Sequence, residues 1–244
     1  MNPRALLAEL LGTYTLVFLG SLSVVSAAGS GAPPLLIAPF GFGFALLAGI
    51  AMFGHVSGAH FNPAVTLAAW IDRRVSLADA IGYVVAQAFG ALLTSMTILV
   101  LFGKDLVDNT RNAPASILND PQAFGIEVLL TAIFVTVILT VTSRAAAQAV
   151  FVIPITLLMI HFAAIPISGA SVNPIRSLAP AIVSGNYEHL WVYLTAPFLG
   201  AILAWGLYRL MASGGEPGDG SADDLDEGMY DELDDEDLEP APIR

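Results

Sequence analysis

Six long apolar runs constrain this chain more than any other feature of its sequence. They lie at about residues 5–28, 35–54, 78–102, 122–143, 148–167 and 189–211. Each reaches the roughly 20 residues that an α-helix needs to cross about 30 Å of hydrocarbon. The chain is 56% hydrophobic and only 12% charged, with a mean hydropathy of +0.74, which is too apolar for a soluble domain of this length. The sequence therefore predicts an all-α membrane protein with six transmembrane helices.

The first apolar run has an alternative interpretation as a cleaved signal peptide, because Ser26-Ala27-Ala28 resembles a small-residue cleavage site. However, the run is long, contains Glu9 and leads into further apolar runs. We therefore predict that it is a transmembrane span. The chain has no cysteine, so cysteine usage does not indicate a redox compartment.

The few basic residues predict the orientation of the spans. Cytoplasmic loops of membrane proteins carry an excess of Lys and Arg. If the N-terminus is cytoplasmic, the basic residues on the inside outnumber Lys104 and Arg111 on the outside; those inside are Arg4, Arg73, Arg74, Arg144 and Arg209. The sequence thus predicts a multi-pass protein of the cell membrane with both termini in the cytoplasm.

The segment between the second and third runs, residues 57–66, reads S-G-A-H-F-N-P-A-V-T. Asn62 is a good helix N-cap, and Pro63 suits the first helical position because its missing N–H would be unpaired there. Ala64 continues the predicted short helix. Residues 58–61 would then be non-helical backbone at membrane depth, which is tolerated where it lines a watery cavity. The segment is therefore a candidate pore element.

The same device returns 111 residues later as Asn173-Pro174-Ile175. A single Asn-Pro marks an ordinary turn, but interrupted segments at matching positions of two hydrophobic halves indicate a site near the membrane midplane. Each half has three spans, an odd number, so the second half must be inverted relative to the first. Two half-helices would then meet at the midplane with the positive ends of their dipoles, which disfavours cations.

At these two motifs the chain resembles the aquaporin, or major intrinsic protein, family, over about residues 5–211. The resemblance implies six transmembrane helices plus two re-entrant half-helices in an inverted-repeat fold. It divides the chain into a channel domain, 1–211, with repeats at about 5–102 and 122–211. It also implies a homotetramer in the lipid bilayer that conducts water passively. No cofactor, nucleic acid partner or enzymatic activity is expected.

The family has a second checkpoint of four residues, and the resemblance places it at Phe42, His161, Ala170 and Arg176. Water-selective members have Phe, His, a small residue and Arg there. Glycerol-conducting relatives typically replace the His by Gly and follow the Arg with Asp, whereas this chain has His161 and Ser177. Water is thus the expected permeant, and glycerol or another small neutral solute is the alternative. Ile175 replaces the usual Ala of the motif and leaves the width of the pore centre open.

Two acidic residues, Glu9 and Glu127, lie at matching positions inside spans. An unpaired charge at the bilayer centre costs about 2.5–3.5 kcal/mol on insertion scales. The resemblance favours a supporting role for both residues beneath the re-entrant backbone, and a proton relay is the alternative. His60 is expected to brace the first loop in the same way.

Other function classes find less support in the sequence. An intramembrane enzyme would need a nucleophile with a base, or a metal cluster, and neither pattern is present. A non-conducting structural membrane protein remains an alternative. Residues 103–121 are expected to form a polar external loop. Residues 212–244, with 13 acidic residues, are expected to form a disordered cytoplasmic tail, and a partner-binding or gating tail is the alternative.

Overall fold

The computed structural model describes residues 2–30 and 34–213, whose regular secondary structure is helical with no strand among them. The helices are α1 (Pro3–Ser30), α2 (Pro34–Ser57), α3 (Pro63–Ile71), α4 (Leu77–Phe102), α5 (Lys104–Asp108), α6 (Asp120–Arg144), the 3-10 helix η1 (Ala146–Gln148), α7 (Ala149–Ala164), α8 (Pro174–Ser184) and α9 (Leu190–Ser213). Six of them are long and apolar enough to cross a membrane. The predicted all-α fold with six spans is confirmed.

Several helix ends differ from the prediction. The second span continues to Ser57 rather than ending at about residue 54. The fifth span ends at Ala164 rather than at residue 167, because the Ala164 carbonyl accepts the N–H groups of Ile167, Ser168 and Gly169 in a tight turn. The segment 103–121 was expected as a loop throughout but contains the short helix α5. Of the predicted tail, residues 212 and 213 belong to α9, and the rest lies outside the described residues.

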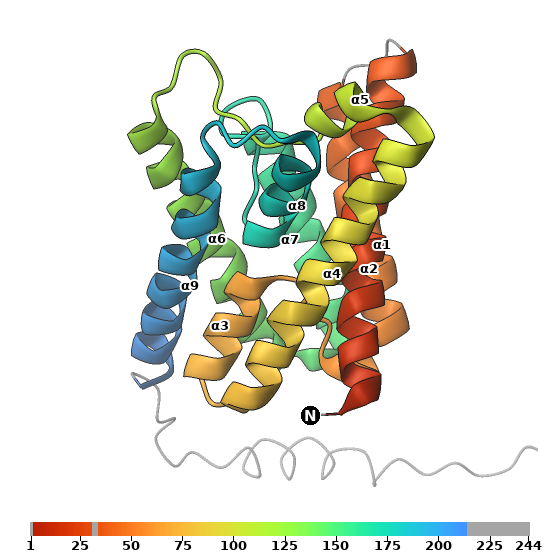
Figure 1. Cartoon of the computed structure of the whole chain (residues 1–244). Coiled ribbons are helices and arrows are strands. Elements are labelled where there is room, and N and C mark those ends of the chain that lie inside the picture. The colour runs from red at the N-terminus through yellow and green to blue at the C-terminus, as the bar shows by residue number, and fades with distance from the viewer. Residues whose placement is uncertain (1, 31–33, 214–244) are drawn as a thin grey trace, which may run out of the picture. The chain divides into compact units, whose positions relative to one another are not determined.

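The two half-helices, α3 and α8, begin in the middle of the bundle and run toward opposite faces (Figure 1). Each begins at an Asn-Pro pair. The Asn62 side chain accepts the N–H of Ala64, and the Asn173 side chain accepts the N–H of Ile175. Because the cap satisfies an N–H that has no partner within the helix, both half-helices can begin in the interior of the bundle.

The two halves also share a close helix contact that depends on glycine. A Cβ added at Gly90 would lie 2.3 Å from the backbone oxygen of Leu10, and one added at Gly200 would lie 2.6 Å from that of Val128. Gly90 thus lets α4 approach α1, and Gly200 lets α9 approach α6 in the second half. Such small residues allow close packing of membrane helices.

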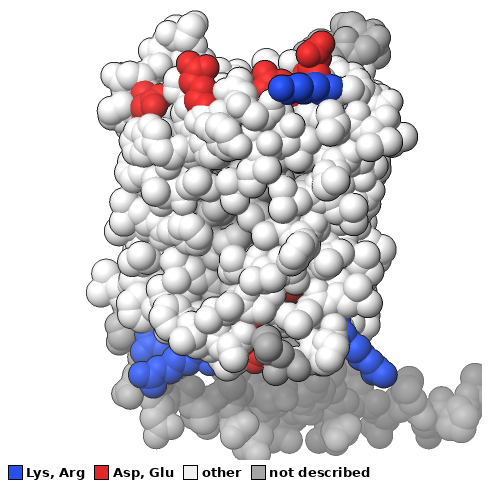
Figure 2. Space-filling model, viewed as in Figure 1, with Lys and Arg blue, Asp and Glu red and all other residues white. Residues whose placement is uncertain are grey.

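Charged side chains gather at the two ends of the helical bundle, and a middle with few charged side chains separates them (Figure 2). We call the end at which α1 begins the N-terminal face. Lysine and arginine side chains seen in this view lie mostly at the N-terminal face, and acidic side chains gather at the opposite face. This distribution is typical of a protein whose middle lies in hydrocarbon.

Candidate pore

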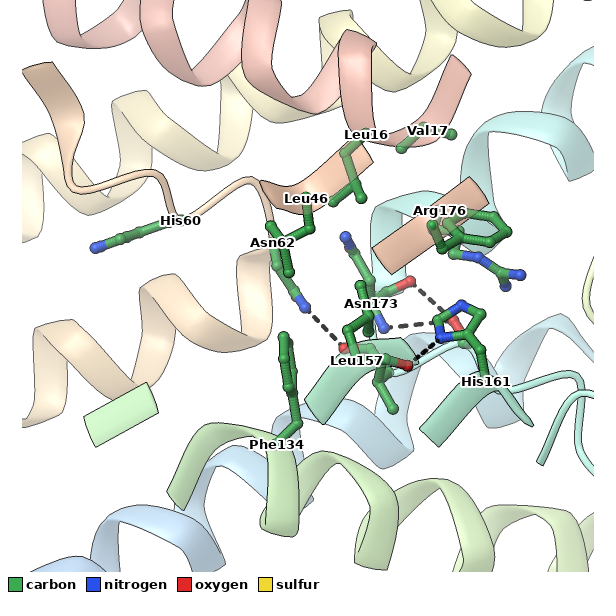
Figure 3. A pocket seen from close by; sticks show the side chains of 13 residues that line it. Leu16, Val17, Leu46, His60, Asn62, Phe134, Leu157, His161, Asn173 and Arg176 are labelled. Carbon is green, nitrogen blue, oxygen red and sulfur yellow. Dashed lines mark hydrogen bonds between the residues drawn. The ribbon is translucent and has the colours of Figure 1, made fainter. Parts of the chain in front are cut away.

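The two N-cap asparagines link the re-entrant segments to each other at the centre of the bundle. The Nδ2 atom of Asn62 donates to the carbonyl of Val172 over 2.7 Å, and Nδ2 of Asn173 donates to the carbonyl of Phe61 over 3.0 Å. Figure 3 shows both amides beside the same small cavity. Since each amide nitrogen carries two hydrogens, each retains one donor for a molecule in the cavity.

The backbone before each asparagine adopts the same unusual conformation. Left-handed φ angles occur at Gly58, Ala59 and Phe61 in the first segment, and at Gly169, Ala170 and Val172 in the second. Such angles cost on the order of 1–3 kcal/mol for each residue other than glycine. The surroundings must therefore hold this backbone in place.

Glu9 accepts four hydrogen bonds, three of them from the first segment and one from Gln87 of α4. Its Oε1 accepts the Ser57 hydroxyl at 2.6 Å and the backbone N–H of His60 at 3.0 Å. Its Oε2 accepts the backbone N–H of Phe61 and the amide of Gln87, both at 2.8 Å. The carboxylate is fully buried, and these donors offset the cost of its burial.

Glu127 accepts three hydrogen bonds, all from the second segment. Its Oε1 accepts the Ser168 hydroxyl at 2.7 Å and the N–H of Ser171 at 3.0 Å, and its Oε2 accepts the N–H of Val172 at 2.9 Å. Both predicted loop-supporting glutamates thus contact the segment of their own repeat.

A tyrosine adds a further bond in each half. The Tyr83 hydroxyl donates to the Ser57 carbonyl at 2.9 Å, and the Tyr193 hydroxyl donates to the Ser168 carbonyl at 2.7 Å. These bonds fix the carbonyl of the residue that precedes each left-handed stretch.

His60, the third predicted support, lies within the first segment. Its Nδ1 is 3.1 Å from the Thr66 hydroxyl, and its ring contacts the Tyr83 ring edge to face, with centroids 5.3 Å apart. The His60 side chain thus contacts the half-helix α3 that follows it and the helix α4.

The four residues predicted to form the constriction are all buried, and Phe42 contacts both His161 and Arg176. The Phe42 and His161 rings stack with centroids 4.6 Å apart. The Arg176 guanidinium lies 4.4 Å from the centre of the Phe42 ring, a favourable cation–π distance. Ala170 is fully buried in the backbone segment before Asn173. Helices α2 and α7 and the start of α8 bring the three contacting side chains together.

The polar atoms of this cluster are only partly satisfied by protein. His161 Nδ1 is 2.9 Å from the Leu157 carbonyl, and because a carbonyl can only accept, Nδ1 carries the hydrogen. Nε2 is then the acceptor of a neutral ring. Among the described residues, His161 Nε2 and the Nε and Nη1 atoms of Arg176 are buried without a partner. They can accept from and donate to a small polar molecule.

The cavity at the centre is small and joins a larger one. The small cavity is about 20 Å³ and is lined by both asparagines, by Phe42, His161 and Arg176, and by apolar side chains from α1, α2, α6 and α7. In Figure 3, His161 and Arg176 lie at one side of the cavity and His60 at the other. A vestibule of about 570 Å³ shares the lining residues Leu46, His60 and Phe134 and extends past His55 and Arg74.

The Ile175 side chain points away from this cavity. It packs with Val17 of α1, Ala91 of α4 and Ala179 of its own half-helix, and it does not line the small cavity. Ala64, its counterpart in the first motif, is fully buried in the main core. The extra bulk of isoleucine is therefore accommodated between helices. Pro63 and Pro174 occupy the first helical positions.

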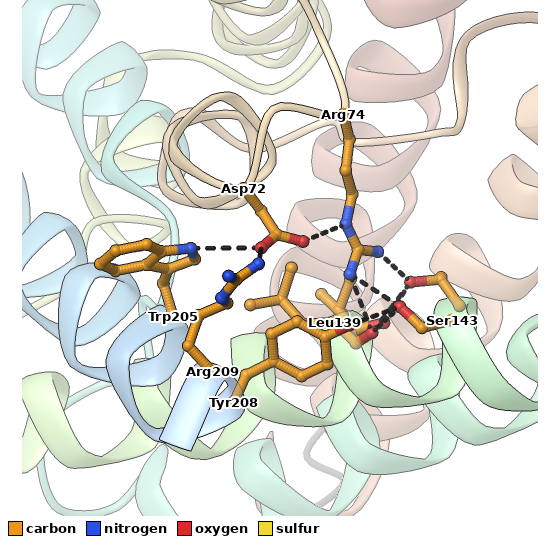
Figure 4. Close-up of polar contacts among 9 residues, drawn as sticks. Asp72, Arg74, Leu139, Ser143, Trp205, Tyr208 and Arg209 are labelled. Atoms are coloured by element: carbon orange, nitrogen blue, oxygen red, sulfur yellow. Dashed lines mark hydrogen bonds and ion pairs between the residues drawn. The ribbon is translucent and has the colours of Figure 1, made fainter. Parts of the chain in front are cut away.

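A polar cluster at the N-terminal face fixes the turn that follows α3 (Figure 4). Arg74 donates to Asp72 at 2.8 Å, to the Thr142 hydroxyl at 2.7 Å and to the Ser143 hydroxyl at 2.8 Å. The other carboxylate oxygen of Asp72 accepts from Trp205 at 3.2 Å. The guanidinium thus joins the end of α3 to the end of α6 beside the vestibule.

Sequence reasoning missed several side chains that hold the segments. Ser57 and Ser168 occupy matching positions and could have been found by aligning the repeats around Asn62 and Asn173. Tyr83 and Tyr193 open a stretch in which the two repeats are similar. Asn112 also contacts the second segment, but it lies in the connection between the repeats and no local signal marks it.

Comparisons with known proteins agree with this geometry. The profile described as "Major intrinsic protein" matches residues 1–208. The chain is 42% identical to "Glycerol uptake facilitator protein-like 6" of Lactiplantibacillus plantarum, over 86% of this chain and 99% of that protein. It is 39% identical to "Aquaporin Z" of Photorhabdus laumondii, over 85% and 97%.

The fold has a counterpart among solved structures. The aquaglyceroporin from Plasmodium falciparum matches with a TM-score of 0.79 at 24% identity, over 86% of this chain and 97% of that one. At this identity the likeness supports the fold alone. The family profile and the two relatives extend over both repeats and both Asn-Pro motifs. This multi-pass membrane protein therefore belongs to the major intrinsic protein family of channels.

Proposed function

We propose that the chain is a channel that conducts water passively down osmotic gradients and excludes glycerol, protons and ions. The observation that carries the proposal is the constriction at which Phe42, His161 and Arg176 meet. An aromatic ring and an imidazole limit the width there. The unpartnered atoms of His161 and Arg176 replace some of the hydrogen bonds that a water molecule loses on entering.

The size of the central cavity supports water over larger solutes. A cavity must have a volume of about 10–15 Å³ to hold one water molecule, and the central cavity has about 20 Å³. One water molecule therefore fits between the asparagines and the constriction, whereas glycerol, with six heavy atoms, requires the lining side chains to move apart.

The charges around the cavity support the exclusion of cations. Two half-helices begin at Asn62 and Asn173, and each presents the equivalent of roughly half a positive charge at its N-terminus. Arg176 adds a full positive charge at the constriction. In this proposal the two asparagine amides orient passing water through their free hydrogens, and Glu9, Glu127 and His60 hold the strained backbone.

Glycerol conduction is the second candidate, and one observation favours it: the relative that is 42% identical is named as a glycerol uptake facilitator-like protein. Against it stand His161, which narrows the constriction, and Ser177, where glycerol-conducting relatives typically have Asp. The two candidates differ in one measurable quantity, the ratio of glycerol to water permeability.

The deciding experiment is stopped-flow light scattering of proteoliposomes that contain the purified protein. With an impermeant osmolyte we expect shrinkage at least tenfold faster than that of empty vesicles. With glycerol we expect no re-swelling beyond that of empty vesicles. Fast re-swelling would establish a glycerol facilitator, and shrinkage at the rate of empty vesicles would support a non-conducting structural protein.

Widening the constriction tests whether Phe42 and His161 limit its width. In the double variant Phe42→Ala, His161→Gly the bore loses both rings but keeps Arg176 and the two asparagines. We expect glycerol uptake to rise at least tenfold while ionic current stays at background, because the positive charges are unchanged. A well-folded double variant that remains as glycerol-tight as the parent would place the constriction elsewhere.

Assembly and orientation form part of the same proposal. We expect a homotetramer in the cell membrane, which native mass spectrometry of the detergent-solubilised protein can test. We expect both termini in the cytoplasm, since Arg4, Arg144 and Arg209 lie near the ends of spans that would face it. Protease accessibility of a C-terminal tag in right-side-out vesicles would contradict this orientation.

A further inference from the structure

Asn112, in the connection between α5 and α6, contacts the second re-entrant segment with both ends of its side-chain amide. Nδ2 donates to the Gly169 carbonyl over 2.7 Å, and Oδ1 accepts from the Ser177 hydroxyl over 2.7 Å. The residue is buried, with 4% of its surface exposed. A buried amide that uses both its donor and its acceptor fixes the distance between its two partners.

The two partners of Asn112 are the direct neighbours of two constriction residues. Gly169 precedes Ala170, and Ser177 follows Arg176. The contact with Gly169 is close, because a Cβ added there would lie 3.0 Å from Asn112 Nδ2. Asn112 therefore bridges the two limbs of the loop, the one that carries Ala170 and the one that carries Arg176.

Arg176 needs such support from its backbone. Its Nε and Nη1 atoms have no hydrogen-bond partner among the described residues, and its guanidinium contacts the face of Phe42. Within residues 2–30 and 34–213, Arg176 thus has no ion pair, and neither Nε nor Nη1 has a hydrogen bond that would hold the head group. Its position follows from the backbone at the start of α8, which the bond from Ser177 to Asn112 secures.

In the first re-entrant segment, a different residue contacts the start of the half-helix. Thr66 is the counterpart of Ser177, and it accepts a hydrogen bond of 3.0 Å from the amide of Gln87, which also donates to Glu9. The counterpart of Gln87 in the second half is Pro197, which has no side-chain amide. Asn112 supplies an amide where the helix of the second half cannot.

We propose that Asn112 is a positioning residue for the constriction, and that it sets the ratio of glycerol to water permeability through Gly169 and Ser177. This inference rests on the proposed function of the constriction. It assigns a specificity role to the external connection, which otherwise would serve only to join the repeats. A merely structural Asn112 would affect the stability of the fold but not this ratio.

The test compares Asn112→Ala with a matched control, Thr110→Val. Thr110 lies in the same connection and is similarly buried, with 7% exposed, but its hydroxyl bonds only to Val107 within its own turn. In proteoliposomes we expect Asn112→Ala to raise the glycerol-to-water permeability ratio at least fivefold. We expect Thr110→Val to leave the ratio within twofold of the parent. Asn112→Asp keeps the acceptor for Ser177 and loses the donor to Gly169. Its glycerol-to-water permeability ratio should lie between those of Asn112→Ala and Thr110→Val.

A readout that needs no conduction separates this inference from the proposed function. The chain has no cysteine, so Ala170→Cys introduces a single reporter thiol beside Gly169. Adding Asn112→Ala should raise the rate of modification of this thiol by a methanethiosulfonate reagent at least fivefold. If the parent conducts water and rejects glycerol, and Asn112→Ala changes neither the ratio nor the thiol rate, the inference is wrong and the proposed function stands.

The remaining outcomes are also decisive. If the parent itself conducts no water, the proposed function fails, and the assigned specificity role fails with it whatever the thiol rate. If Asn112→Ala does not fold, Ser177→Ala removes one of the two links with a smaller change. The glycerol-to-water permeability ratio of Ser177→Ala should be at least twofold higher than that of the parent. An unchanged ratio in folded Ser177→Ala would overturn the inference.

Discussion

The two re-entrant segments, 57–66 and 168–177, have matching backbones but differ in the side chains that complete them. Left-handed φ angles recur at matching positions, and in each segment a glutamate, a serine and a tyrosine hold them. At the third residue after the asparagine, however, the first segment has Val65 and the second has Arg176. The shared contacts hold the backbone, and in the proposed function the unmatched residues determine what can pass.

The support of the two segments also differs in its source. In the first, the amide that reaches the half-helix comes from Gln87 within a transmembrane helix. In the second it comes from Asn112 in the connection between α5 and α6. Loops are less restrained than packed helices. The second segment, which carries Ala170 and Arg176 of the proposed constriction, therefore depends on the more easily perturbed partner.

The largest expected effect comes from removing the shared support. Glu9→Leu would leave four donors without their acceptor, and Glu127→Leu would leave three. A buried donor without a partner costs about 1–3 kcal/mol, so we expect neither variant to yield a monodisperse protein in detergent. Glu188→Gln, at an exposed position, is the control. Equal stability of parent and variants in thermal unfolding would refute the supporting role.

A smaller but specific effect should follow when the second segment is made to resemble the first. Arg176→Val places the side chain of Val65 at the matching position and removes the charge of the constriction. We expect proton or cation leakage to rise at least tenfold, because the arginine charge that repels cations is lost. Water flux should stay within about threefold, because both half-helix dipoles and both asparagine amides remain. A pH-sensitive dye trapped in the vesicles measures the leak. A proton-tight variant would show that the dipoles alone suffice.

Supplying the missing amide to the second half sharpens the comparison further. Since Tyr193 contacts Ser168 as Tyr83 contacts Ser57, a residue four positions after Tyr193 should face the segment as Gln87 does. We expect Pro197→Gln to reduce, at least twofold, the rise in glycerol-to-water ratio caused by Asn112→Ala. No reduction in a folded double variant would indicate that α9 does not present position 197 to Ser177.

The smallest effect is expected at the remaining difference between the motifs, Ile175 in place of Ala64. Ile175→Ala should lower stability by about 2–4 kcal/mol, because it leaves a cavity between Val17 and Ala91. Water flux per folded protein should stay within about twofold, since Ile175 does not line the small cavity. Stopped-flow measurements at matched protein density would detect a large gain, which would mean that isoleucine partly obstructs the pore.

Much of the fold and part of the site could be predicted because their signals are local. Apolar length specifies the spans, and Asn62 and Asn173 mark the starts of both half-helices. Residues at fixed spacings from these starts, such as His161 and Arg176, then come together as expected. The helix α5 was missed because it is shorter than any periodic pattern can indicate. The contacts of Asn112 could not be predicted, since they depend on how an external connection folds back onto the second segment.

The reciprocal asparagine bonds also bear on how the molecule is made. The first half of the chain leaves the ribosome before the second exists, because synthesis runs from the N-terminus. Until Val172 and Asn173 arrive, the Asn62 amide and the Phe61 carbonyl lack their partners. We therefore expect the first re-entrant segment to reach its final conformation only after the second half has inserted. Neither half alone would contain a complete pore, so an incompletely synthesised chain would not form an open pore in the membrane.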